Sequence, residues 1–430
     1  MYAHAGIVLA VMVAVFLLAR RVRVTIELAM FAAAVAGLLA HGTGYAEIPR
    51  HLVDGAFTYF DVTLIFITAT LFMNLLKEAG GVAYIIRAIL RRFHRQRTLT
   101  LVLLTLILLV PGALTGAGSV TVLIVGGLVG TVLTYMGVPQ TNVVAIVFLC
   151  AAMSAAAPPV NLWAMMTAAG SNMPYVGFFL PLAVITLAGA LFSMFYLGWR
   201  GSPPDLARVM RELPEPPPGL TGWKVAAPFV VLLALIAAGR LWPWAVPVLG
   251  LPLLFMISAA MVLLISPIRL PVVAVTSRTI EGLLPLIGVM IVVGILVQSM
   301  ALTGARGLIS LSVVLLPLAV IYGLLFLILP FSEGLLQYAV GPLLGVPLIL
   351  LFNMKGLNPI IALAGMATMW PIGDMLPPTT VVGRAAVMVL RYEGAYYREF
   401  VRATLVPALV ILALGTAYVV FSRQLAFLVW

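Results

Sequence analysis

The sequence predicts an all-α polytopic membrane protein with two inverted-topology repeats. Each repeat is expected to have five crossings, one re-entrant hairpin and a helix broken at mid-membrane. Three observations support this fold class. Of the 430 residues, 63% are hydrophobic and only 9% are charged, a balance typical of helical membrane proteins. Long apolar runs alternate with short basic loops, and several landmarks recur in both halves at one fixed offset.

Residues 1–198 form the predicted first repeat. Its five apolar spans are expected near 5–19, 24–40, 61–76, 142–169 and 176–198. A further apolar region, about 98–133, is interrupted at "VPGALTGAGS". Each arm beside the interruption is shorter than the ~20 residues that a full crossing needs. We therefore expect a re-entrant hairpin that enters and leaves on the same side.

A polar, Pro-rich segment, 199–224, is predicted to be a cytoplasmic linker between the halves. Residues 225–430 form the predicted second repeat. Its five spans are expected near 225–239, 246–266, 281–300, 359–390 and 403–422. Its hairpin, about 309–352, is interrupted at "LPFSEGL". The spans 142–169 and 359–390 each contain a double proline and are predicted to be the broken helices.

The basic residues predict the orientation in the membrane. In the first span they follow the apolar run, which is the reverse of a cleaved signal peptide. With the N-terminus outside, 19 of the 24 Lys and Arg residues fall in inside segments, as the positive-inside rule expects. Both termini are then outside, in the cytoplasmic (inner) membrane of a bacterium or archaeon. The stretch 84–97 is predicted to be a basic amphipathic helix that anchors to anionic lipid.

The two halves share landmarks at an offset of 219 residues. Pro111 and Pro330 are expected to mark the hairpin tips, and Pro158 and Pro377 begin the two "PP" pairs. Gly137 and Gly356 differ by the same number. This regularity predicts a duplicated unit. Because five crossings is an odd number, the second unit is inverted relative to the first, an arrangement typical of secondary transporters with a site at mid-membrane.

The double prolines predict how each broken helix contributes to that site. Proline lacks an N–H and clashes with the carbonyl four residues earlier, so the carbonyls of Ser154, Ala155, Gly373 and Asp374 are expected to be free for a hard cation such as Na⁺. A new half-helix begins after each break, and its free N–H groups favour an anion. Polar side chains at these starts are placed either to cap the half-helix or to meet a substrate: Asn161, Thr379 and Thr380.

The hairpin tips are expected to form the opposite wall. Glycines there permit close approach, and neighbouring side chains offer oxygens. In the first tip the oxygens belong to Thr115, Ser119 and Thr121, and in the second to Ser332, Glu333 and Gln337. The structural alternative is that these small residues only allow close helix packing.

Asp374 and Glu333 are the deepest acids that the pattern places in the membrane, which makes them functional candidates. Alternatively, Asp374 caps a helix end or pairs with Arg384, and Glu333 faces solvent at the hairpin tip. The position in the first repeat equivalent to Asp374 is Ala155. The two sites are therefore expected to differ chemically.

At these motifs the sequence resembles the large membrane subunit of TRAP transporters, the DctM-like branch of the ion transporter superfamily. Two regions carry the resemblance: "LTGAGSVTVLIVGGLVGTVLTYMGVPQTNVVAIVFLCAAMSAAAPPVNL" and "SEGLLQYAVGPLLGVPLILLFNMKGLNPIIALAGMATMWPIGDMLPPTTVVG". The resemblance implies a Na⁺-coupled importer of organic anions, usually carboxylates, that works by an elevator motion. Cation-binding positions carried over from the family are Thr115, Gly116, Ser119, Ser154, Pro158, Ser332, Gly334, Gly373, Pro377 and Thr379, to which Asp374 adds acidity.

The same resemblance implies a small membrane subunit and a periplasmic binding protein as separate chains, unless the protein works alone. A homodimer is compatible with it. The chain departs from the family in its "PPTT" motif and in Glu333 and Asp374, which leaves room for proton coupling. We expect no organic cofactor, no transition metal and no nucleic-acid partner, because the basic residues cluster in loops and the one cysteine is isolated.

Two other classes of function remain open from the sequence. A membrane enzyme would use Asp374 and Glu333 for acid–base chemistry, but it would not need the acid-free counterpart of the break at 155–160. A channel would favour rings of like charge or aromatic gates, which the sequence does not show. We therefore expect a cation-coupled transporter of a small organic anion rather than an enzyme.

Overall fold

The computed structural model describes residues 2–242, 244, 247 and 249–429, and every regular element in that part of the chain is helical. Nine of the described helices are long and apolar enough to cross a membrane. The predicted fold class, an all-helical polytopic membrane protein, is confirmed. The apolar core extends through the helices rather than forming a separate soluble domain.

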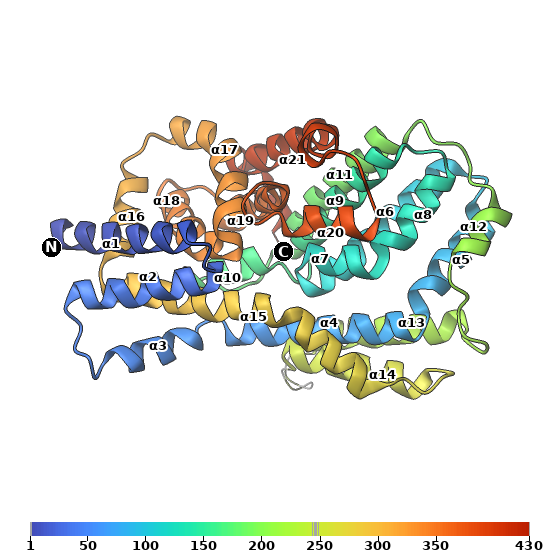
Figure 1. Cartoon of the computed structure of the whole chain (residues 1–430), viewed down its shortest axis with the longest axis horizontal. Helices are drawn as coiled ribbons and strands as arrows, with labels where there is room; N and C mark the ends of the chain where they lie inside the picture. Colours follow the sequence, from blue (N-terminus) through green and yellow to red (C-terminus); the bar gives the residue numbers. More distant parts are fainter. Residues whose placement is uncertain (1, 243, 245–246, 248, 430) are drawn as a thin grey trace.

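One layer of helices comes from the beginnings of both halves (Figure 1). Its members are α1 (Tyr2–Arg21), α2 (Ile26–His41), α3 (Ile48–Ala56), α4 (Phe60–Glu78), α13 (Gly222–Leu241), α14 (Leu251–Ile265), α15 (Val272–Leu302) and α16 (Ala305–Val314). Within it α14 packs on α4, and α15 packs on α2, α3 and α4. Segments more than 200 residues apart thus form one unit, which we call the scaffold layer.

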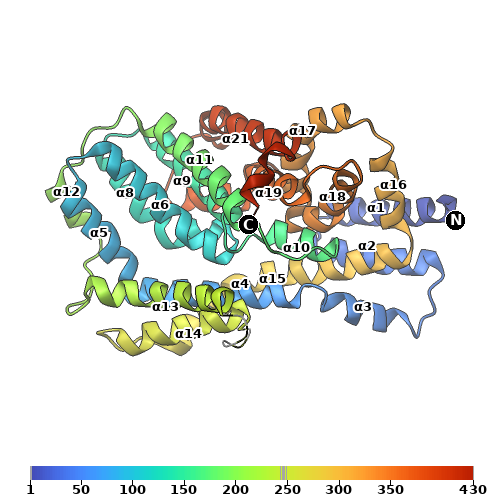
Figure 2. The same ribbon diagram turned by 180° about the vertical axis from the view of Figure 1, so that it is seen from behind.

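The rest of the first half lies on the scaffold layer (Figures 1 and 2). Its helices are α5 (Gly81–Phe93), α6 (Arg97–Thr115), α7 (Gly118–Thr121), the π-helix η1 (Val122–Gly126), α8 (Gly127–Tyr135), α9 (Gln140–Ala156), α10 (Leu162–Gly170) and α11 (Phe179–Gly198). Helix α6 packs along α9, and α9 packs along α11. The predicted span 142–169 is therefore two helices, α9 and α10, with a break between them.

The second half has a matching set of helices. They are α17 (Leu318–Leu336), η2 (Gln337–Ala339), the π-helix η3 (Gly341–Gly345), α18 (Val346–Met354), α19 (Pro359–Met369), the 3₁₀ segment η4 (Trp370–Met375), α20 (Val381–Val389), η5 (Tyr396–Val401), α21 (Arg402–Val420) and η6 (Gln424–Leu428). Three element starts repeat at the 219-residue offset: 122 and 341, 127 and 346, and 140 and 359. These starts agree with the proposed duplication, while the inverted topology stays a prediction.

The hairpin tips lie later in the chain than predicted. Helix α6 continues through Pro111 to Thr115 and ends at Gly116, which has φ 75°. Helix α17 continues through Pro330 to Leu336. A proline removes one helical hydrogen bond, but surrounding helices can satisfy the freed group. In the first tip, the left-handed glycine ends the helix.

The lengths of the hairpin arms also differ from expectation. The first arm, α6, has 19 residues, and 118–135 forms an 18-residue second arm; both are long enough by length and composition to cross. Length alone therefore does not establish a re-entrant path, which stays a prediction. In the second half, residues 305–314 form the separate helix α16, and the hairpin begins at Leu318 rather than near 309. The Pro317 that precedes α17 is compatible with a helix start there.

Several predicted boundaries move. Helix α15 has 31 residues and extends well beyond the predicted span 281–300. Helix α14 replaces the span 246–266, of which residues 246 and 248 lie outside the described part. The linker ends at 221, because α13 begins at Gly222. The sequence did not predict α3.

The linker is folded onto the molecule. It contains α12 (Leu206–Glu212), whose N-terminus is capped by the Asp205 carboxylate. The guanidinium of Arg87, on α5, donates to the carbonyls of Met210 and Leu213 at 3.1 and 2.8 Å. It also lies 3.7 Å from the Glu215 carboxylate. One arginine of the predicted membrane-surface helix therefore holds the linker instead of facing lipid.

Candidate functional site: two helix breaks and two hairpin tips

The first break is closed by one buried side chain. Asn161 accepts a hydrogen bond from the Ala164 N–H at 2.9 Å, and its amide donates to the Ala156 carbonyl at 2.7 Å. It therefore satisfies an orphan donor of α10 and an orphan acceptor of α9 together. Between them, Pro158 and Pro159 are joined by a cis peptide bond. Of the two predicted roles for Asn161, capping is the one that its contacts show.

The first hairpin tip packs directly against this break. The Val160 N–H donates to the Ala113 carbonyl at 3.0 Å. The hydroxyls of Thr121 and Ser154 are 2.7 Å apart. A Cβ at Gly112 would overlap the Ser154 side chain, so only glycine allows α6 to approach α9 this closely. The tip and the break thus form one continuous polar wall.

The second break has the same relation to the second tip. Residues 376–380 are not helical, and Pro377–Pro378 is again cis. The N–H and hydroxyl of Thr379 both donate to the Gly334 carbonyl, at 3.3 and 3.0 Å. Val160 and Thr379, the two residues that donate from the breaks, are 219 positions apart. A Cβ at Gly373 would overlap the Pro330 carbonyl, so α17 and η4 are also in backbone contact.

The half-helices beyond the breaks cross to the opposite hairpin. Helix α10 packs on η3, and α20 packs on α7 and η1. A Cβ at Gly341 would lie 3.1 Å from the Trp163 carbonyl, and one at Gly118 would lie 3.3 Å from a Val382 methyl. Each tip therefore contacts the break of its own half and the half-helix of the other half.

Glu333 is the side chain that joins the two halves at this crossing. The residue is 1% exposed, and Oε2 accepts a hydrogen bond from the Trp163 indole N–H at 2.9 Å. The buried Oε1 has no hydrogen-bond partner among the described residues. Trp163 stacks on Tyr338 with ring centroids 4.7 Å apart. Glu333 therefore does not face solvent, which was the structural alternative for it.

Asp374 follows Gly373, whose backbone packs against Glu333: a Cβ at Gly373 would lie 2.8 Å from the Glu333 Cβ. Asp374 is 5% exposed. Among the described residues, no ion pair includes either acid, so Arg384 does not pair with Asp374. Two buried carboxyls without a basic partner are unfavourable in a membrane unless a cation or a proton neutralises them.

Two of the predicted free carbonyls are in fact occupied. The Ser154 carbonyl accepts from the Ala157 N–H at 3.1 Å, and the Gly373 carbonyl accepts from the Leu376 N–H at 2.8 Å. Tight turns at the helix ends supply these donors. A carbonyl has two lone pairs, so each keeps the capacity for a second ligand.

The predicted site residues fall into two groups. Around the first tip and break lie Thr115, Gly116, Ser119, Ser154, Pro158 and Asn161. Around the second lie Ser332, Glu333, Gly334, Gly373, Asp374, Pro377, Thr379 and Thr380. The hydroxyls of Thr115 and Ser332 bond to carbonyls of their own helices. The Thr380 hydroxyl is buried without a partner at the start of α20.

The sequence reasoning missed Trp163 and Tyr338, which complete the surroundings of Glu333. The position of Trp163, two residues after a helix break, could have marked it as a candidate. Its hydrogen-bond partner Glu333 lies 170 residues away in the sequence, so the pair was not predictable. In the described residues, no group of three or more His, Cys, Asp or Glu side chains could hold a metal ion. A cation at this site would therefore depend on carbonyl and hydroxyl oxygens together with the acids, which are ligands typical of hard cations.

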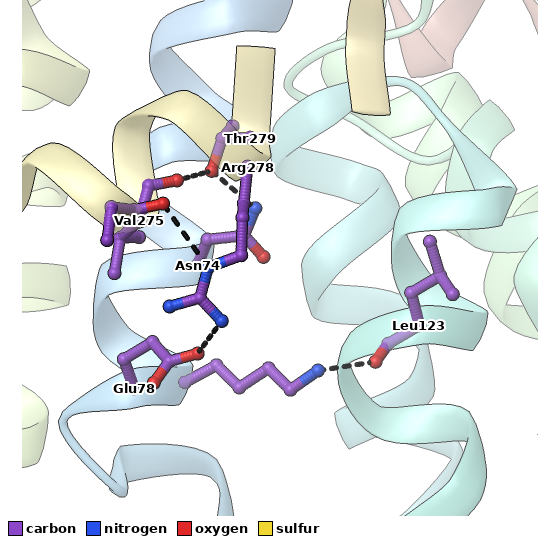
Figure 3. Close-up of polar contacts among 8 residues, drawn as sticks. Asn74, Glu78, Leu123, Val275, Arg278 and Thr279 are labelled. Carbon is purple, nitrogen blue, oxygen red and sulfur yellow. Dashed lines mark hydrogen bonds and ion pairs between the residues drawn. The ribbon is translucent and has the colours of Figure 1, made fainter. Parts of the chain in front are cut away.

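A polar contact connects the hairpin to the scaffold layer (Figure 3). The ammonium group of Lys77, at the end of α4, donates to the Leu123 carbonyl in η1 at 2.8 Å. On the scaffold side, the Asn74 amide donates to the Thr279 hydroxyl at 2.9 Å, and Arg278 approaches Glu78 at 4.0 Å (Figure 3). A cavity of about 610 Å³ lies beside Lys77. It is lined by α4, α5, η1 and α8 and by Pro214, Glu215 and Pro217 of the linker.

Comparisons with known proteins show the fold of the chain. No protein-family model matches it, and no curated protein matches it. It is similar to the solved structure of MtrF from Neisseria gonorrhoeae, described as one of a class of antimetabolite efflux pumps, with a TM-score of 0.61 and 14% identity over 88% of this chain and 84% of that one. It is also similar to the YdaH transporter of Alcanivorax borkumensis, which has an unusual topology, with a TM-score of 0.63 and 14% identity over 88% of this chain and 89% of that one. At this identity the likeness establishes a shared fold.

Proposed function

We propose that the chain is a cation-coupled secondary transporter of a small organic anion, such as a carboxylate, in a cytoplasmic membrane. One observation carries the proposal. Each hairpin tip contacts the break of its own half and the half-helix of the other half, so both halves surround one buried polar region. Broken helices that meet in this way are typical of transport sites at mid-membrane. The fold shared with two transporters supports the same class.

The coupling cation is proposed to bind beside Glu333 and Asp374. Within the described part of the chain, neither buried acid forms an ion pair, and carbonyls of the second break lie next to them. Na⁺ is the first candidate, because carbonyl and hydroxyl oxygens accompany the acids. The unpartnered Oε1 of Glu333 favours a second candidate, coupling to protons, since a buried carboxyl can be neutralised by protonation.

The anionic end of the substrate is proposed to bind at the start of α20. The first N–H groups of a helix attract an anion. At the start of α10, the Asn161 side chain already accepts a hydrogen bond from one of these N–H groups, that of Ala164. At the start of α20, no described side chain caps the helix, and the buried Thr380 hydroxyl has no partner in the same part of the chain. The two breaks would thus have different roles: the half-helix after the second break would bind the substrate, while the half-helix after the first is capped by Asn161.

Alternating access is proposed to be an elevator motion of the hairpins and broken helices against the scaffold layer. The cavity beside Lys77 is lined in part by α4 of the scaffold layer and by η1 and α8 of the hairpin, and the Lys77–Leu123 hydrogen bond crosses between them.

The TRAP-type resemblance remains a proposal, including a separate small subunit and binding protein. A stand-alone transporter of the same superfamily is the alternative. MtrF is described as an efflux pump, so both directions of transport must be measured.

The test is transport by the purified chain in proteoliposomes. A panel of radiolabelled mono- and dicarboxylates is supplied under an imposed Na⁺ gradient, an imposed proton gradient, or no gradient. We expect at least one substrate to accumulate only when one gradient is present. Absence of gradient-dependent movement, for every substrate and in both directions, would contradict the proposal.

A further inference from the structure

An apolar groove lies where α5 and α6 meet the scaffold layer. It has a volume of about 300 Å³ and is lined by α4, α5, α6, η1 and α13. Figures 1 and 2 both show α5 leading from the end of α4, close to α13, to the start of α6. Two lining side chains on α6 are open to the outside of the molecule: Leu106 is 41% exposed and Val110 is 38% exposed. The groove is therefore accessible from the lipid phase.

The groove has a direction. Helices α5 and α6 run antiparallel from the turn at 94–96, so the Ile89 end of α5 faces the Leu103 end of α6. The opposite end of the lining is at Pro111 and Val82. Leu103 and Pro111 are eight residues apart, which is about 12 Å along a helix. The groove thus extends from the basic turn toward the hairpin tip, as a lipid chain extends from the interface into the membrane.

Positive charge lies at the mouth of the groove. Ile85 and Ile89 line it, and Arg92 follows on the same face of α5 at helical spacing. Arg92 and Arg95 are exposed. No described ion pair includes them, and residues 79–204 contain no Asp or Glu. This charge is complementary to an anionic headgroup.

We propose that the groove is a binding site for one anionic phospholipid. Its acyl chain lies along α6 between Ile89 and Val110, and its headgroup phosphate contacts Arg92 and Arg95. The bound lipid fills the space between the first arm of the hairpin and helices α4 and α13. This assignment is independent of the transported substrate. It differs from general adhesion to anionic lipid because it requires a particular arginine and an open groove.

The chain offers matched controls. Arg91 carries the same charge as Arg92, but it lies one turn beyond Arg87, on the face that holds the linker. Val184, on α11, is 43% exposed, close to the value for Leu106, and it does not line the groove. Arg91→Gln therefore removes a charge away from the groove, and Val184→Trp adds an equally exposed indole elsewhere.

The experiment is native mass spectrometry of the purified full chain with phosphatidylglycerol and phosphatidylcholine of identical acyl chains. We expect the wild type and both controls to retain one phosphatidylglycerol in preference to phosphatidylcholine. Arg92→Gln is expected to lower this retention about fivefold, the effect of one basic residue at a membrane surface. Leu106→Trp is expected to abolish it.

Equal retention of both lipids by the wild type would overturn the proposal. So would an equal loss in Arg91→Gln and Arg92→Gln, which would indicate only general attraction. Retention unchanged by Leu106→Trp would show that the lipid binds elsewhere. If Leu106→Trp does not fold, Ile89→Phe narrows the same groove from α5 instead. It is likewise expected to abolish phosphatidylglycerol retention, and unchanged retention would show that the lipid binds elsewhere.

Discussion

The close contact between the second hairpin and the second break predicts that Gly373→Ala is strongly disruptive. The new Cβ would overlap the Pro330 carbonyl and lie 2.8 Å from the Glu333 Cβ. Carbon atoms in contact normally lie about 3.5–4.0 Å apart, so α17 and η4 must separate by about 1 Å. The Thr379 hydrogen bonds to Gly334, now 3.3 and 3.0 Å, would then exceed ordinary hydrogen-bond length.

The expected magnitude follows from these two effects. Overpacking costs about 1–3 kcal/mol, and each lost hydrogen bond costs about 0.5–1.5 kcal/mol. We therefore expect a loss of about 2–6 kcal/mol in the stability of the tip–break contact. The assay is thermal unfolding in detergent together with gradient-driven uptake. Both are expected to decrease.

Gly323→Ala provides the matched control for that variant. Gly323 lies earlier in α17, and a Cβ there meets nothing within 4 Å. Alanine is also the better helix former by about 1 kcal/mol. The control is expected to be at least as stable as the wild type and fully active. If the two variants behave alike, the backbone contact between α17 and η4 is not what holds the second site together.

Three further substitutions test other parts of the site. Glu333→Gln keeps an acceptor for the Trp163 indole but removes the charge, so we expect a folded protein whose uptake no longer depends on the cation gradient; a normal dependence would exclude Glu333 from coupling. Asp374→Asn is expected to reduce transport or shift its pH dependence, and unchanged uptake over roughly pH 5 to 8 would remove this acid from the mechanism. Lys77→Met removes the hydrogen bond to Leu123 and is expected to increase hydrogen exchange in η1 and alter the transport rate. Identical hydrogen exchange of η1 in the wild type and in Lys77→Met would show that the Lys77–Leu123 contact does not restrain the hairpin.

Apolar length and double prolines were enough to predict an all-helical membrane fold and the positions of the two helix breaks. The breaks near Pro158 and Pro377 lie where the sequence placed them, because an internal proline pair is incompatible with a continuous helix. The tips were less predictable. Pro111 and Pro330 also looked like breaks, yet α6 continues for four residues beyond its proline and α17 for six. A single proline leaves one unsatisfied carbonyl, and whether neighbouring helices satisfy it depends on tertiary packing.

The candidate site was predictable by residue type but not by pairing. Glu333 and Asp374 were conspicuous because acids are rare in apolar runs. Their environment was not readable, since the Trp163 indole belongs to the other half and reaches Glu333 only after the half-helices cross. Likewise, nothing local to Arg87 indicated that its guanidinium would bind linker carbonyls at 210 and 213. Contacts between distant segments are set by the packing of whole helices.

A cation that binds at Glu333 is proposed to drive transport, and its binding can be measured before any substrate is known. Proteoliposomes on a solid-supported membrane are subjected to a sudden rise in Na⁺ or proton concentration, and the charge displaced by cation binding is recorded. We predict a transient current for one of the two cations in the wild type and in Gly323→Ala, and its loss in Glu333→Gln. No transient with either cation, or a transient of equal size in Glu333→Gln, would contradict cation binding at Glu333.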